Sequence, residues 1–79
     1  MNKEKRIVIA ASGWVFIGNV VEHPDRIQMY DASVIRVWGT TKGLGQIALE
    51  GPTSETILDF CGEVQLFLPA VIAQIKCDV

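Results

Sequence analysis

The chain is poor in the residues that build metal centres and disulfide frameworks. Its 79 residues include two cysteines, Cys61 and Cys77, and one histidine, His23. The cysteines lack the CxxC spacing of a zinc or redox site, and two cysteines are too few for a disulfide framework. We therefore expect no metal and no cofactor. The simplest interpretation of the cysteines is two small buried thiols, with a bridge between them left open.

Charged residues are also scarce. They make up 20% of the chain, against roughly 25% in soluble domains. The net charge of −2 and the pI near 5.2 argue against a broad nucleic-acid or anionic membrane surface, because such a surface requires clustered lysine and arginine. The carboxylates are scattered near expected turns, and none is paired as an acid with a base. We expect a protein that is not an enzyme and that binds neither nucleic acid nor membranes.

No hydrophobic run is long enough to cross a bilayer. The basic start over residues 1–6 and the apolar segment over 7–21 together imitate a signal peptide, but no small-residue cleavage site ends the segment. Its roughly 15 apolar residues, interrupted by glycine, asparagine and serine, are too few to span about 30 Å of hydrocarbon. We interpret this segment as two strands of a cytoplasmic protein.

Apolar side chains, by contrast, are abundant. They are 49% of a chain that is long enough for only one domain, over residues 1–79. A domain of this size buries roughly 60 to 65% of the surface that its unfolded chain exposes, so its own core is thin. Since neither a metal nor a disulfide framework is available to stabilise it, we expect the excess apolar surface to be covered by self-association into a homo-oligomer.

The pattern of β-branched residues and turns predicts a mainly β fold. The segment over 14–22 is apolar on both faces, which is typical of a central strand or of a barrel strand with one face in an interface, and Gly18 suggests a bend or a close backbone approach there. The final segment over 70–77 is expected to be a strand, with a helix as the alternative. The expected strands cover residues 6–11, 14–22, 26–31, 34–38, 53–60, 64–68 and 70–77.

A short helix interrupts these strands at about residues 43–50. Leu44, Ile47 and Ala48 recur at helical spacing, Thr40 or Thr41 is expected as its N-cap, and Gly51-Pro52 is a good stop. A hairpin turn is expected at residues 61–63. The result is a compact open barrel of six to seven short strands, of the SH3-like or Sm-like kind.

The loop between the fourth expected strand and the helix is the one candidate binding site. Glycine-rich backbone, a helix N-terminus and nearby cations suit an anion, threonine hydroxyls add donors, and a tryptophan ring offers a face for stacking a base. The alternative is that the loop only turns a strand into a helix. The candidate ligand-binding residues, within and next to the loop over 38–45, are Arg36, Trp38, Thr40, Thr41, Lys42 and Gly43.

Two resemblances add expectations. The segments VFIGNVVE and IQMYDA, within residues 15–32, resemble the paired second and third strands of Sm-like RNA-binding barrels, which implies a small barrel and RNA as a possible partner class. The chain departs from that family because it lacks a leading amphipathic helix and the later RNA-contacting motif. The segments VIRVWGTTKGLGQIALEGP and VIAQIKC resemble small uncharacterised phage and mobile-element proteins. Some small proteins from such elements sequester nucleotide signals used in host defence, so this resemblance implies a nucleotide as a ligand class.

These observations predict a non-enzymatic, homo-oligomeric small β protein that binds an anionic small molecule, such as a nucleotide, through the 38–45 loop. A structural or protein-interaction module with no small-molecule ligand is the first alternative. In that module Trp14, Trp38 and Phe67 would form protein–protein contacts. An Sm-like RNA-binding protein is the second alternative.

Overall fold

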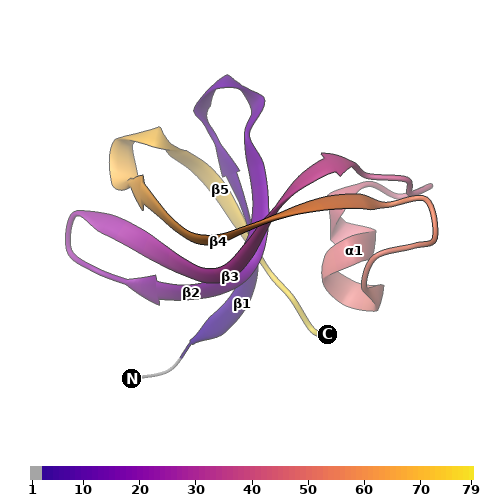
Figure 1. Cartoon of the computed structure of the whole chain (residues 1–79), viewed down its shortest axis with the longest axis horizontal. Helices are drawn as coiled ribbons and strands as arrows, with labels where there is room; N and C mark the ends of the chain where they lie inside the picture. Colours follow the sequence, from indigo (N-terminus) through magenta and orange to yellow (C-terminus); the bar gives the residue numbers. More distant parts are fainter. Residues whose placement is uncertain (1–2) are drawn as a thin grey trace.

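The computed structural model describes residues 3–79 as one antiparallel sheet with a short helix beside one end of it (Figure 1). Single 3-10 turns follow the first strand, at Ala11–Gly13, and the fourth, at Leu68–Ala70. The elements are β1 (Glu4–Ala10), β2 (Val15–Glu22), β3 (Arg26–Val37), α1 (Leu44–Glu50), β4 (Ile57–Phe67) and β5 (Val71–Lys76).

The strands are ordered β4-β3-β2-β1-β5 across the sheet. All four pairings are antiparallel, and β2 lies in the middle, which confirms the prediction from its two apolar faces. The prediction of a strand near the C-terminus is also confirmed, because β5 pairs with β1. The two ends of the sheet, β4 and β5, each have a strand neighbour on one side only. Both of them are edge strands.

The expected count of six or seven strands is wrong for residues 3–79, which contain five. Two positions where the sequence predicts the end of a strand lie inside longer strands of the structure, where the pairing is irregular. At Asp31, φ is 52°, and β3 continues through it from Arg26 to Val37. At Gly62, φ is 82°, and β4 continues from Ile57 to Phe67 in place of the expected hairpin. Aspartate and glycine favour turns, but at these two positions they form bulges, which bend a strand without ending it.

Hydrophobic side chains pack on both faces of the sheet. One cluster, the inner core, draws on all five strands. The other, the helix-side core, joins β1, β2 and β3 to α1. The inner core contains Val8, Ala10, Phe16, Val20, Ile27, Met29 and Ala32, with Val34, Val64, Leu66 and Val71 packed against it. The helix-side core contains Ile7, Val15, Ile17, Ile35, Leu44, Ile47, Ala48 and Cys77.

The helix α1 docks through the three residues whose spacing predicted it. Leu44, Ile47 and Ala48 are its buried residues, and the chain end adds a bond from the Asp78 N–H to the Ala48 carbonyl, at 2.7 Å. Gly51 ends the helix as expected, with its N–H bonded to the Ile47 carbonyl. The expected threonine N-cap is wrong: Gly43 is the cap residue, with φ of 81° and no side-chain cap bond.

Within residues 3–79, no helix is both long enough and apolar enough to span a bilayer.

Candidate functional site

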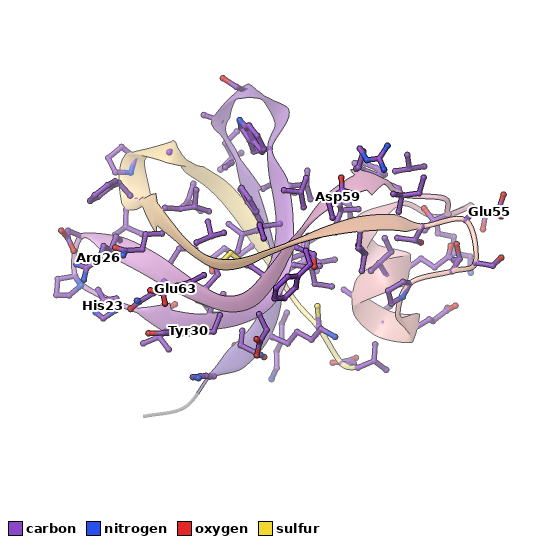
Figure 2. The ribbon with its side chains drawn as sticks, in the orientation of Figure 1. His23, Arg26, Tyr30, Glu55, Asp59 and Glu63 are labelled. Atoms are coloured by element: carbon purple, nitrogen blue, oxygen red, sulfur yellow. The ribbon has the colours of Figure 1, made fainter. Side chains whose placement is uncertain are left out.

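Arg36, one of the proposed ligand-binding residues, is paired with a carboxylate of the neighbouring strand. It lies near the end of β3, and its Nε donates to Asp59 Oδ2 of β4 at 2.7 Å, while Nη2 lies 3.4 Å from Oδ1. This hydrogen bond and the charge of Asp59 raise the pKa of Arg36. The guanidinium therefore bridges the two strands across the sheet edge, where Asp59 is labelled in Figure 2.

Three backbone N–H groups of the loop, those of Thr41, Lys42 and Gly43, already have acceptors inside the chain. The Gln46 side-chain oxygen accepts from the N–H groups of Thr41 and Lys42, at 3.2 and 3.0 Å, and lies 3.3 Å from the Thr41 hydroxyl. The Thr40 hydroxyl accepts from the Gly43 N–H at 2.9 Å. These are the groups that an anion would need. As the loop stands, Gln46 and Thr40 occupy them.

The loop is also tied to the segment that follows α1. The Thr53 hydroxyl donates to the Gly39 carbonyl at 2.6 Å, and the Thr56 hydroxyl donates to the Trp38 carbonyl at 2.7 Å. Gly39 has φ of 61°, and a Cβ there would overlap the backbone of Glu55. The fold itself therefore requires glycine at position 39, whether or not a ligand binds to the loop.

Two of the proposed residues remain available on the surface. The Trp38 ring is 45% exposed and lies against Gly43, within 3.7 Å of the position of a Cβ built there. Lys42 is exposed, and in residues 3–79 its ammonium forms no ion pair. The structure thus places the Trp38 side chain against Gly43, while Arg36 is paired with Asp59. The anion site stays a prediction.

The thiols and the histidine lie apart. Cys61 is exposed on β4, whereas Cys77 is buried, and both are free; the expectation of two buried thiols holds only for Cys77. Burial raises the pKa of Cys77.

His23 Nε2 lies 3.0 Å from Gln28 Oε1, and the Gln28 amide donates to Glu63 at 2.6 Å (Figure 2). No group of three metal-ligating side chains occurs in the described part of the chain.

Exposed apolar side chains are the feature that the sequence did not locate. Eleven large hydrophobic side chains are exposed in residues 3–79. Six of these eleven lie between residues 57 and 72, on the edge strands and the turn that joins them: Ile57, Leu58, Phe60, Phe67, Leu68 and Ile72. The excess of apolar residues was visible in the composition. Their position on the sheet edges follows from the strand order, which local patterns do not encode.

The chain matches no protein-family model, no curated protein and no solved structure. Function is therefore inferred from the geometry of residues 3–79 alone.

Proposed function

We propose that this chain is a non-enzymatic, homo-oligomeric β protein that works as an interaction module. The observation that supports this proposal is the exposure of large apolar side chains on the two unpaired sheet edges. Phe60 and Phe67 of β4 are 73% and 60% exposed, and Ile72 of β5 is 68% exposed. Large exposed apolar side chains gathered on one part of a protein mark interaction sites when they form a patch, and six of the eleven here lie between residues 57 and 72.

The backbone of β4 favours the same mode of association. An edge strand presents unpaired N–H and C=O groups that template pairing with another strand, and β4 offers this edge over eleven residues. Asp59 and Glu63 place carboxylates along the edge, and bulges interrupt its register. Such charges and bulges limit open-ended stacking. A closed oligomer of a few copies fits this combination better than a fibre does.

We also propose that the sheet is the wall of an open barrel of the SH3-like or Sm-like kind. The continuous strand order β4-β3-β2-β1-β5 and the inner core shared by all five strands support this assignment. Barrels avoid exposed edges by closing. Here β4 and β5 are joined only through Leu68–Ala70 and are not paired with each other, so each edge is open to another copy.

The test is the solution mass of the full chain, measured by light scattering coupled to size exclusion at micromolar concentration. We expect a multiple of the 8.7 kDa chain mass. Phe60→Ser should shift the mass toward one copy, because burying such a side chain contributes roughly 1.5–3 kcal/mol. Leu49→Ser is the matched control. Leu49 is 60% exposed but lies on α1, so its substitution should leave the mass unchanged.

A mass of one chain for the unsubstituted protein would contradict the proposal. So would an oligomer that dissociates with Leu49→Ser but persists with Phe60→Ser, since association would then occur through the helix and not through the sheet edges.

A second candidate is the binding of an anionic small molecule, such as a nucleotide, by the 38–45 loop. The exposed Trp38 ring next to Lys42 and Gly43 favours it.

Gln46→Ala would free the N–H groups of Thr41 and Lys42 and should strengthen anion binding if these groups are the site. Lys42→Ala and Trp38→Ala should abolish thermal stabilisation by nucleotides without dissociating the oligomer. A nucleotide panel that produces no stabilisation of any variant would eliminate this candidate.

A further inference from the structure

A polar cavity lies on the helix side of the sheet and reaches β4 at Leu58, one of the exposed apolar side chains described above; none of the residues of the 38–45 loop lines it. Its volume is about 350 Å³, near the lower end of the range for small-molecule sites. Four polar side chains line it: Lys5 from β1, Asn19 from β2, and Asp31 and Ser33 from β3. The apolar part of the lining comes from Ile17, Pro52 and Leu58.

The register of the sheet brings these side chains together. Lys5 and Asn19 are directly opposite each other on β1 and β2, and Ser33 is opposite Ile17 on β2 and β3. Directly opposed residues have their Cβ atoms about 4.5–5.5 Å apart on the same face. Pro52 follows the C-cap of α1, so the segment after the helix supplies the facing wall. One copy of the chain forms the whole cavity.

A bulge in β3 turns Asp31 toward this side. Between the pairs Ile17 with Ser33 and Asn19 with Tyr30, three steps along β3 match two along β2. Without the additional residue, Asp31 would share the inner face of Met29, two positions earlier. With it, Ala32 takes the inner position and is fully buried, while Asp31 is exposed in the cavity. Bulges re-aim side chains in this way next to functional sites.

The bulge has a conformational cost that the sequence accommodates. Asp31 has φ of 52°, a left-handed conformation that is strained for most side chains but that aspartate and asparagine tolerate better. Gly18 allows the close approach of the two strands, since a Cβ there would lie 2.9 Å from the Ala32 Cα. The backbone conformation of Asp31 and the absence of a side chain at Gly18 thus together allow the bulge that exposes the Asp31 carboxylate.

The four polar side chains have no partners elsewhere in the described chain. In residues 3–79, none of Lys5, Asn19, Asp31 and Ser33 forms a side-chain hydrogen bond or an ion pair. The three arginines, in contrast, all bond to carboxylates. A cation, a carboxylate, an amide and a hydroxyl thus converge on one cavity with their hydrogen-bonding capacity unused.

We propose that this cavity binds a phosphorylated sugar. The Lys5 ammonium would take the phosphate as a charge-assisted contact. The Asp31 carboxylate would accept hydrogen bonds from adjacent sugar hydroxyls, which is how an acidic residue holds a ribose in dinucleotide-binding folds. Asn19 and Ser33 can each donate and accept. Such a ligand is either a free sugar phosphate or the ribose phosphate of a mononucleotide. The proposal does not depend on self-association.

The test is a titration of the full-length, isotope-labelled protein followed by its amide NMR spectrum, with ribose 5-phosphate and AMP as probes. We expect both to shift the resonances of β1, β2 and β3 around the cavity. Ribose alone and inorganic phosphate alone should bind at least roughly tenfold more weakly, because each makes only half of the contacts. AMP binding more tightly than ribose 5-phosphate would identify a nucleotide as the ligand. Equal affinities would identify the sugar phosphate.

Substitutions locate the site. Lys5→Ala should weaken binding of ribose 5-phosphate at least roughly tenfold, and Asp31→Asn should weaken it while keeping the bulge, because asparagine also tolerates the left-handed conformation. Lys76→Ala is the matched control: it removes an exposed lysine of β5 that does not line the cavity, and it should leave the affinity unchanged. The amide spectra of the free variants report whether each is folded.

Two results would overturn the proposal. One is the absence of any shift around the cavity with either probe at about 10 mM, tenfold above the weakest affinities normally counted as binding. The other is a loss of affinity in Lys5→Ala that is no greater than in Lys76→Ala, which would mean that Lys5 does not hold the phosphate. Neither result bears on the solution mass, so the proposed self-association is tested separately.

Discussion

At position 18, the absence of a side chain allows β2 and β3 to approach each other. A Cβ there would lie 2.9 Å from the Ala32 Cα and 3.1 Å from the Tyr30 carbonyl oxygen. These are backbone atoms, which cannot move aside as a flexible side chain can. The sequence indicated a bend or close approach at Gly18, and the structure confirms it and shows which strand is the neighbour.

Gly18→Ala should therefore destabilise the protein. We expect a loss of roughly 1–3 kcal/mol, the usual cost of overpacking, measured as the free energy of unfolding in urea. Gly45→Ala is the matched control. Gly45 lies in α1 with nothing within 4 Å of the position of its Cβ, so alanine should stabilise the helix by about 0.5–1 kcal/mol. A loss of similar size in both variants would contradict the close approach at Gly18.

The buried thiol of Cys77 makes stability depend on pH. Burial raises its pKa, so the folded protein keeps the proton longer than the unfolded chain does. The resulting stabilisation is complete below the unfolded value of about 8.5 and is lost as the pH rises from there through the folded pKa. We expect the urea midpoint to fall across this alkaline window and to fall less in Cys77→Ala. An identical decline in both proteins would exclude the thiol as its cause.

At the scale of elements, α1 is held by its packing. With seven residues, it is far shorter than the roughly 12–15 that an isolated helix needs in water. Its stability comes from the helix-side core and from the bonds at its end. The polar contacts before it, centred on Gln46, replace the threonine cap that the sequence suggested.

Ile47→Ala should consequently cost roughly 2–5 kcal/mol, because Ile47 is fully buried against the sheet. Leu49→Ala, on the exposed side of the same helix, should change the free energy of unfolding by no more than about 0.5 kcal/mol. Urea unfolding of the two variants beside the parent measures both. Equal effects at the two positions would mean that α1 does not dock through the face that the structure assigns.

At the scale of the whole molecule, exposed apolar edges couple stability to concentration. If copies cover each other's β4 and β5 edges, the folded state is stabilised by mass action. The melting temperature should then rise with protein concentration. In Phe60→Ser, which removes the most exposed large apolar side chain of β4, it should be nearly independent of concentration. A parent melting temperature that stays constant over a hundredfold dilution would contradict this coupling.

Much of the fold was predictable from the sequence because the signals are local. Alternating β-branched residues identified the segments of β1, β2 and β5, and the spacing of Leu44, Ile47 and Ala48 identified α1. The strand count was wrong where Asp31 and Gly62 were read as turns. A residue that permits a positive φ permits a turn or a bulge equally well, and only pairing with the neighbouring strands decides between them.

The candidate sites were harder to predict because they depend on contacts between residues that are far apart in the sequence. The 38–45 loop could be proposed from the sequence because its residues are adjacent in the chain, yet the N–H groups of Thr41, Lys42 and Gly43 donate to Gln46 and Thr40. The polar cavity joins Lys5, Asn19, Asp31 and Ser33 across three strands. No sequence pattern links these positions, because a strand register must exist before they meet.

The sequence by itself determined a small, mainly β domain with more apolar surface than it can bury, since composition and local periodicity suffice for both statements. Only the tertiary structure decided that β4 and β5 are the unpaired edges and that the bulge in β3 turns Asp31 outward. Strand order, register and the direction of each side chain depend on contacts between residues far apart in the chain, and these form only when the whole sheet assembles.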